Sequence, residues 1–397
     1  MIVDRSAWEN VRFGDVVEQV RATVDPVADG VERYVAGEHM NTDRLRITQW
    51  GIVGDNYLGP AFYRGFEPGQ VLYGSRRTYL RKVAYADFAG VCSEKTFVVR
   101  SICFDRLIPR FLPLLMSAEA FHAHSINQSR GSVNPYVNWS SLTWYEFALP
   151  PIAEQERIAD LIWAADEVAV KAEATAEAAR LVEKRVLEDA YTDFSWPTVR
   201  VDEAGEVQLG KMLNSKNQTG LQAKPYLRVA NVGDDRLLLN DVLKMDFNEK
   251  DLVKFTLRSD DILLVEGSGA DSEIGRAAMW HDEIDYCCFQ NSLLRFRAGN
   301  DVLPEFAYGW LRRAYYRGDF ARHSSKTTSL AHLTATRFAK MDFPLPELAA
   351  QHKIVEQVAK ARNARRRLEE HAALSRKLVR ALIDRILGED DPPHDLQ

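Results

Sequence analysis

Two long stretches of the chain carry small or apolar residues at alternating spacings of three and four. The first stretch runs from Ile158 to Ala190 and the second from Ile354 to Ile386, and neither contains Gly or Pro between its ends. A pattern of this kind, kept over several heptads, is typical of helices that pack along one seam. We therefore predict two helices of about 35 residues each that pack on each other.

The charges of the two predicted helices are complementary. Residues 153–190 carry a net charge of −5, and residues 347–388 carry a net charge of +5. Because a globular stretch of chain separates the helices, an antiparallel pairing is the natural topology. Glu183 and Arg365 are the fully charged seam positions, and this pairing brings them within about one layer of each other. We predict that they meet; the alternative is an exposed Arg365 at the helix edge.

The chain also contains a copy of itself. Three matches occur in the same order, with offsets of 188, 191 and 196 residues: Trp8–Asp15 with Trp196–Glu203, Phe66–Leu72 with Leu257–Leu263, and Phe147–Ile158 with Phe343–Ile354. Short β-rich runs alternate with helical patches in both halves, at 96–100, 261–265, 292–297 and 305–316. We predict a mixed α/β fold with domains at 1–150 and 192–346, helices at 151–191 and 347–388, and a flexible tail at 389–397.

Composition narrows the class of protein. A chain of 397 residues with 46% hydrophobic residues can bury one large core or several ordinary ones. It has no apolar stretch long enough to cross a bilayer and no basic start followed by an apolar run, so we expect a cytoplasmic protein without membrane contact. The four cysteines show no C-x-x-C spacing, which favours buried free thiols over disulfides or a zinc site.

No motif for catalysis or metal binding is complete. The segment 267–271 lacks the lysine and the spacing of a phosphate-binding loop, and the sequence has neither G-x-S-x-G nor H-E-x-x-H. His122 and His124 are two residues apart, so they would not share a helix face. Asn134-Pro135-Tyr136 lacks one proline of the N-P-P-Y signature of adenine methyltransferases, which favours a turn.

Positive charge is concentrated in two regions of a chain whose net charge is −6. Residues 59–86 carry a local charge of +4 with interleaved tyrosines, and residues 306–340 carry +6. Such clusters in an acidic protein indicate phosphate binding on a chosen face. At the repeat offset of 196, the polar loop 129–132 coincides with 325–328, and hydroxyls with a cation are typical phosphate contacts. Ordinary solvated loops remain the alternative for both.

One motif is similar to that of a known family. Leu149-Pro150-x-Ile152-Ala153-x-Gln155-x-Arg157-Ile158 and its copy from Leu345 to Ile354 resemble the helix start in DNA specificity (S) subunits of type I restriction-modification systems. Segments 33–40 and 224–232, with Gly275-Arg276 and Gln290-Asn291, resemble the recognition domains of that family. The second motif departs from the family pattern, because Ala350 replaces the usual Glu and His352 follows the Gln.

The resemblance implies a noncatalytic reader of double-stranded DNA. Each of two target recognition domains would read half of a bipartite sequence, and the helices would set the spacing between the half-sites. The implied partners are two copies of a modification subunit, which carries S-adenosylmethionine and methylates adenine at N6, and a restriction subunit that uses ATP and Mg. No cofactor or metal is expected in this chain. A coiled-coil adaptor without DNA readout and a nuclease with a divergent site are the alternatives.

Base and phosphate contacts are expected from the polar and basic loops, because these side-chain types pair with base edges and phosphates. In the first domain the expected residues are Arg76, Arg77, Tyr79, Arg81, Lys82, Ser129, Arg130 and Ser132. In the second domain they are Ser268, Asp271, Arg276, Ser325, Lys326, Thr327 and Thr328.

Overall fold

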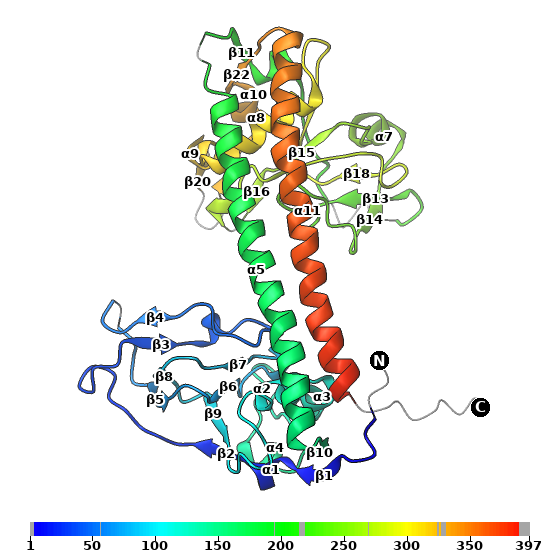
Figure 1. The fold of residues 1–397 in the computed structure, drawn as a ribbon. Coiled ribbons are helices and arrows are strands. Elements are labelled where there is room, and N and C mark those ends of the chain that lie inside the picture. The colour runs from blue at the N-terminus through cyan, green and yellow to red at the C-terminus, as the bar shows by residue number, and fades with distance from the viewer. Residues whose placement is uncertain are drawn as a thin grey trace. The chain divides into compact units, whose positions relative to one another are not determined.

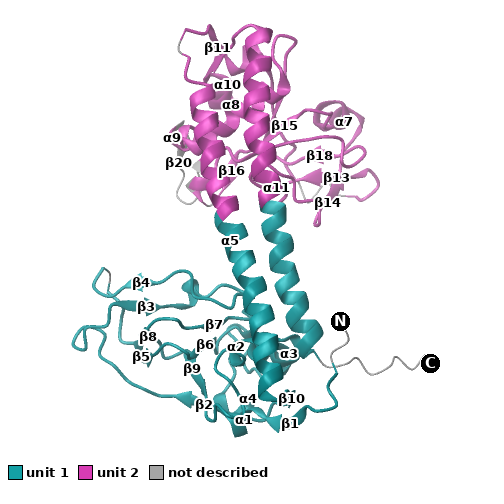
Figure 2. Cartoon of the chain, viewed as in Figure 1, with its two compact units in different colours: residues 1–174, 369–397 teal, residues 175–368 magenta. Residues whose placement is uncertain are grey.

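The computed structural model describes residues 4–55, 57–193, 195–213, 219–268, 270–323, 325–326 and 331–388, and for 271, 323, 325, 326 and 331 it describes the backbone alone. The chain divides into two compact units (Figures 1 and 2). The first unit is residues 1–174 with 369–397, and the second is residues 175–368. Each unit holds a mixed α/β part and a segment of both long helices, which confirms the predicted fold class.

The described residues of the first unit form three sheets. A four-stranded sheet has the order β2 (Val17–Val20), β9 (Thr96–Ser101), β6 (Val71–Gly74), β7 (Val83–Tyr85), and a second has the order β4 (Gly51–Ile52), β3 (Arg33–Val35), β8 (Gly90–Ser93), β5 (Phe62–Phe66). Strands β1 (Glu9–Arg12) and β10 (Glu146–Leu149) pair separately. The short helices are α1 (Phe13–Val16), α2 (Leu112–Ser117), α3 (Glu119–Asn127) and α4 (Trp139–Leu142).

The second unit repeats this plan. Its sheets have the orders β12 (Gly205–Leu209), β19 (Leu293–Ala298), β15 (Ile262–Val265), β17 (Ala277–Met279) and β14 (Leu243–Asp246), β13 (Ala223–Leu227), β18 (Cys288–Phe289). Strands β11 (Thr198–Arg200) and β22 (Asp342–Pro344) pair as β1 and β10 do. The helices are α6 (Val201–Ala204), α7 (Glu249–Phe255), α8 (Pro304–Tyr316), α9 (Asp319–His323) and α10 (Ala335–Ala339).

The matching strand orders confirm the internal duplication. The predicted pairs fall on corresponding elements: the first on β1 and β11, the second on β6 and β15, and the third on β10 and β22. Strand β15 shows why these runs are apolar at successive positions. Ile262 and Leu264 join one core cluster while Leu263 and Val265 join another, because side chains alternate between the two faces of a strand.

The two long helices are α5 (Ile152–Ala190) and α11 (Leu348–Leu387). Every predicted seam position in them is buried or half-buried. The pairing is antiparallel within each unit: Ile158 and Ile162 share a core with Val379, Ile383 and Ile386 in the first unit. In the second unit, the C-terminal part of α5 instead shares a core with the N-terminal part of α11.

The glutamine of the repeated motif ties each helix start to its globular part. Gln155 is fully buried; its side-chain amide donates to Pro150 O at 2.8 Å and its carbonyl accepts from the Ile108 amide at 3.0 Å. Gln351 makes the same contacts, with Pro346 O at 2.9 Å and the Leu303 amide at 2.9 Å. Two different sequences thus keep one glutamine because an amide can both donate and accept here.

In the second unit the predicted seam charges meet. The Arg365 Nε donates to the Glu183 carboxylate at 2.5 Å, and both side chains are almost fully buried. Arg312 of α8 donates to the other oxygen of Glu183, also at 2.5 Å, so an element outside the helices completes the contact. A buried charge is tolerated when hydrogen-bonded partners surround it, and here the carboxylate has two guanidinium groups.

Asp235 is the second buried carboxylate of this network. It lies in the loop after the 3-10 turn Val229–Asn231, with a left-handed backbone at φ 59°. It accepts from the Tyr308 hydroxyl at 2.7 Å and from three arginines of α11, which are Arg362, Arg365 and Arg366. Burial raises the pKa of Asp235, but the nearby guanidinium groups overcome this effect and hold the pKa below its ordinary value.

In the first unit, the loop of the globular part supplies arginines and α5 supplies carboxylates, which is the reverse of the contacts around Asp235. Arg46 donates to Asp166 of α5 at 2.7 Å, and Arg376 of α11 contacts the same carboxylate at 2.5 Å. Glu173 of α5 accepts from Arg376 at 3.0 Å and also from Arg44. Burial raises the pKa of Glu173, whereas hydrogen bonds from these two arginines lower it, and the net shift is downward.

Candidate nucleic-acid interface

Two predicted loops of the first domain come together in the structure. Arg76 forms an antiparallel backbone bridge with Tyr136, and Tyr136 forms another with Arg130. The second bridge has both of its hydrogen bonds, Arg130 N to Tyr136 O at 2.8 Å and Tyr136 N to Arg130 O at 2.9 Å. We call residues 76–77, 129–132 and 134–136 the first ribbon. The loops at 76–77 and 129–132 were predicted to contact DNA, whereas the central segment 134–136 was not.

Exposed positive charge covers the first ribbon. The side chains of Arg76, Arg77 and Arg130 are exposed, and no carboxylate among the described residues forms an ion pair with them. Ser132 is also exposed, and the half-buried Ser129 donates its hydroxyl to Ile126 O at 2.6 Å. Tyr79 lies beside the ribbon with 52% of its surface exposed. Arginines together with an aromatic ring are the groups that nucleic-acid surfaces use.

Arg81 and Lys82 differ from these arginines, although the sequence groups them together. Arg81 is paired with Asp43 at 3.2 Å and with Glu119 at 2.5 Å. Lys82 donates to the carbonyl of Gly37. Both side chains therefore have partners within the protein, and they hold the loop at 75–82 against the rest of the domain.

The second unit builds a ribbon of the same topology. Strands β16 (Gly267–Ser268), β21 (Ala331–His332) and β20 (Ser325–Lys326) form a three-stranded sheet with β21 in the centre. We call these strands the second ribbon. His332 lies 196 residues after Tyr136, and both occupy the central segment. Ser268 and Lys326, predicted from separate clusters, thus lie on one small sheet; Thr327 and Thr328 lie outside the described residues.

The second ribbon has mixed charge. The Ser268 hydroxyl donates to Glu273 at 2.7 Å, and Arg276 pairs with the same carboxylate at 2.9 Å. The hydrogen bond from Ser268 lowers the pKa of Glu273 despite partial burial, and Arg276 lowers it further. His332 Nδ1 lies 3.0 Å from Glu266. Asp271 begins the 3-10 turn Asp271–Glu273 that follows this site, and its side chain is not among those described.

The cations of residues 306–340 do not all lie on one exposed surface. Arg312 is 1% exposed and faces Glu183, so it belongs to the buried network. Arg313 and Arg317 both pair with Glu188 of α5, at 2.8 and 3.2 Å. The carboxylates that neutralise this segment lie on another element, which a local charge count leaves out.

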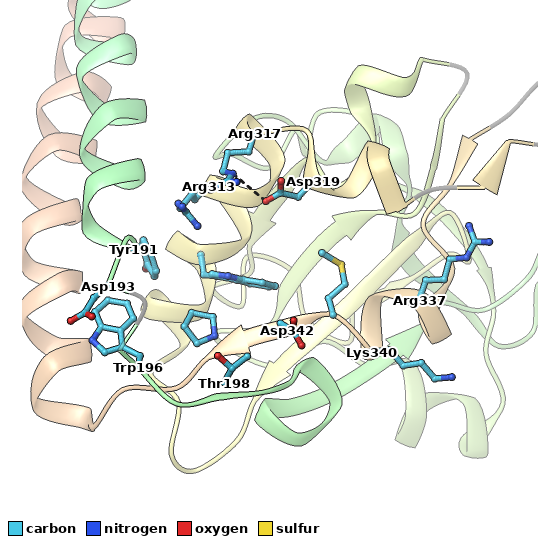
Figure 3. A pocket seen from close by; sticks show the side chains of 13 residues that line it. Tyr191, Asp193, Trp196, Thr198, Arg313, Arg317, Asp319, Arg337, Lys340 and Asp342 are labelled. Carbon is cyan, nitrogen blue, oxygen red and sulfur yellow. Dashed lines mark ion pairs between the residues drawn. The ribbon is translucent and has the colours of Figure 1, made fainter.

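Arg313 and Arg317 border a groove of about 780 Å³ in the second unit (Figure 3). Tyr191 at the end of α5, Trp196 and Trp310 line its apolar part. Its cations include Arg313 and Arg317, whose charges are offset by Glu188 and, for Arg317, by Asp319 at 3.5 Å. The carboxylates thus compensate these two arginines, while the exposed Arg337 and Lys340 also line the groove.

No group of three or more His, Cys, Asp or Glu side chains that could hold a metal occurs among the described residues. The four cysteines are free thiols, and the predicted burial holds for three of them, whereas Cys103 is half-buried. Burial raises the pKa of Cys92 to about 12 and that of Cys288 to about 11, so these thiols stay protonated and unreactive. Among the described residues, no helix is long and apolar enough to cross a membrane.

Comparison with known proteins gives consistent results. The model of the type I restriction modification DNA specificity domain matches residues 6–179 and again 195–372. The specificity subunit of the Escherichia coli type I restriction enzyme EcoDI is 24% identical over 151 residues, which are 38% of this chain and 33% of that protein. The matched region thus spans about a third of that relative's length.

Two solved structures share the fold over nearly the whole chain. The type I restriction-modification S subunit from M. genitalium has a TM-score of 0.57 at 12% identity, with 98% of this chain and 99% of that chain covered. A chain from a study of complex assembly and conformational transition of the type I R-M system has a TM-score of 0.58 at 18% identity, with 96% and 97% covered. At these identities the likeness concerns the fold.

Proposed function

Because the chain belongs to the type I restriction-modification DNA specificity family, we propose that it reads a bipartite DNA sequence and directs adenine N6-methylation and restriction by partner subunits. The first ribbon would contact one half-site and the second ribbon the other. The observation that carries this proposal is the same three-segment ribbon in both units, built from loops rich in cations and hydroxyls.

The chain itself would be noncatalytic. Its sequence has no complete catalytic motif, and the carboxylates of Asp235 and Glu173, whose pKa values are lowered, belong to ion-pair networks rather than to an open cleft. S-adenosylmethionine, ATP and Mg would bind two modification subunits and a restriction subunit. Double-stranded DNA would be the ligand of this chain, held by phosphate contacts and read by base contacts.

Mapping methylated adenines in a host genome tests this function. A host that carries the chain with its modification subunit should methylate one bipartite sequence. Replacing Arg76, Arg77 and Arg130 together with alanine should abolish methylation at that sequence, whereas replacing the surface pair Lys360 and Glu356 of α11, which face each other at 2.7 Å, should leave it intact. Methylation that persists without the chain would contradict the proposal.

We further propose that the two helices set the spacing of the half-sites. Seven residues inserted after Ala174 and seven after Leu368 lengthen both helices by two turns, or about 10 Å, and keep the seam in register. That length corresponds to about three base pairs at 3.4 Å each. Methylome mapping should show a longer spacer between unchanged half-sites; an unchanged spacer would rule out this role.

A further inference from the structure

Arg77 of the first ribbon has an unusual backbone. Its φ of 52° lies in the left-handed region, which residues with a β-carbon rarely adopt. Two hydrogen bonds hold it there: its amide donates to Pro135 O at 2.6 Å, and its carbonyl accepts from the Leu80 amide at 2.7 Å. A backbone held in this region fixes the direction in which the side chain leaves the ribbon.

The side chain of Arg77 is also held in one orientation. Its Nε donates to Asn134 Oδ1 at 2.8 Å, across the ribbon. A guanidinium group has five N–H donors in one plane, so this bond leaves the four donors of the two terminal nitrogens. No carboxylate among the described residues forms an ion pair with Arg77. The result is a fixed, exposed fork of donors whose charge is not neutralised by an ion pair.

Arg81 of the same loop provides an internal comparison. It has nearly the same backbone conformation, with φ 54°. Its guanidinium group, however, is occupied by Asp43 and Glu119. One loop therefore contains two left-handed arginines, of which Arg81 anchors the loop and Arg77 faces outward.

We propose that Arg77 reads a guanine in the half-site bound by the first unit, with Asn134 as its positioning residue. This inference rests on the proposed function. Guanine presents two acceptors, O6 and N7, on its major-groove edge, and they match two parallel N–H groups of an arginine. Adenine presents a donor in place of O6, and cytosine presents a donor, so both leave the fork unmatched.

The surroundings of Arg77 fit such a contact. A narrow β-ribbon can enter the major groove of B-DNA, which is about 12 Å wide. Arg76 precedes Arg77 on the same segment, and Arg130 lies on the opposite outer segment across Tyr136, so both would reach the phosphates. Phosphate contacts fix position without reading sequence, so these two residues supply affinity while Arg77 supplies discrimination.

The test is selection of binding sites from a pool of random-sequence duplexes by the full chain. Wild type should enrich a sequence with a G·C pair that Arg77→Ala no longer requires, and affinity for the enriched duplex should fall by about 10- to 100-fold. Arg77→Gly relieves the left-handed strain and should give the same loss, which separates readout from misfolding. Asn134→Ala should weaken the same G·C preference in part, because the fork is no longer held.

Arg76→Ala is the matched control, since it should lower affinity for all duplexes and leave every base preference unchanged. The inference is overturned if both Arg77 variants still enrich the same base at every position, or if the position they lose is not a G·C pair. Full retention of the preference by Asn134→Ala overturns the positioning role. A wild-type chain that enriches no sequence overturns the proposed function itself, and the inference with it.

Discussion

The two units attach their globular parts to the long helices with partly opposite placement of charge, although in the first unit Asp43 with Arg380 keeps the placement seen around Asp235. In the second unit a loop supplies the carboxylate of Asp235 and α11 supplies the arginines. In the first unit a loop supplies Arg44 and Arg46 and α5 supplies the carboxylates. Asp166 and Arg362 even lie at the repeat offset of 196. A duplicated fold can therefore conserve the position of a contact while its two charges exchange sides.

The networks also differ in burial, and this difference decides how much stability is lost when one charge is removed. Asp235 and Glu183 are fully buried, as is Asp166 in the first unit, but the side chain of Glu173 in the first unit keeps 31% of its exposure and that of Arg46 keeps 35%. A buried charge that loses its partner stays unsolvated, but a half-exposed one regains water. We therefore expect the loss of one charge around Asp235 to destabilise the second unit much more than the loss of the half-exposed Asp43 or Arg44 destabilises the first unit.

Asp235→Ala should have the largest effect, because it leaves Arg312 and three arginines of α11 without their central carboxylate. We expect a loss of about 3 to 5 kcal/mol in the free energy of unfolding of the second unit. Hydrogen exchange read by mass spectrometry measures this for each unit separately, through peptides of residues 175–368 and of the first unit.

Asp43→Ala is the matched control. Asp43 has the same left-handed backbone, with φ 54°, and it pairs with Arg380 and Arg81, but its side chain is 32% exposed. The backbone cost of alanine is common to both variants, so the difference isolates burial. The control should cost about 1 kcal/mol or less in the first unit. Equal losses in the two variants would show that burial does not separate the networks.

Much of the architecture followed from linear patterns in the sequence. The helices, their antiparallel pairing and the meeting of Glu183 with Arg365 were predicted because a heptad seam encodes register along one chain segment. Asp235 was missed, since a loop brings it to the helices and no periodicity marks it. The internal repeat could have identified Asp235. The tripeptide Asp43-Arg44-Leu45 recurs 192 residues later as Asp235-Arg236-Leu237.

The candidate interface was predicted less completely. The loops at 129–132 and 325–328 were matched by their offset, but their pairing with Arg76 and Ser268 depends on backbone bridges between distant segments. Charge counts also failed to separate Arg77 from Arg81, since the partners of Arg81 come from a remote loop and from α3. Whether a cation is available to contact DNA depends on its neighbours in space, and the local sequence does not show which residues these are.

A second prediction uses pH to separate the units. His122 of α3 is 1% exposed, and burial, with the charges of Arg81 and Arg380, lowers its pKa from 6.5 to about 3. Below pH 6.5 the unfolded chain binds a proton that the folded chain excludes, so the first unit should lose up to about 1.4 kcal/mol per pH unit until pH approaches 3. Hydrogen exchange between pH 6.5 and 4.5, corrected for its intrinsic pH dependence, should show this loss.

The second unit should lose much less over that range, because a carboxylate with a lowered pKa, such as Asp235 or Glu273, loses its contribution only below the ordinary carboxyl pKa. The pKa of Asp235 lies below its ordinary value of 3.8, so its contribution is present above 3.8 and is lost only as pH falls through the lower folded value. His122→Leu should remove the loss in the first unit between pH 6.5 and 4.5. A wild-type slope that persists in this variant would assign the pH dependence to another group.

The smallest effect is expected at Arg44, which pairs with Glu173 in the first unit. Arg376 also holds Glu173 and would remain in Arg44→Ala, so the carboxylate keeps a partner and water can reach it. We expect a cost of about 1 kcal/mol or less, and it should shrink further in 0.5 M salt because exposed charges are screened. Hydrogen exchange of first-unit peptides at low and high salt measures this cost. A cost above about 3 kcal/mol, or one that does not change with salt, would mean that this network is as sensitive to the loss of one charge as the network around Asp235. The contrast between the two units would then fail.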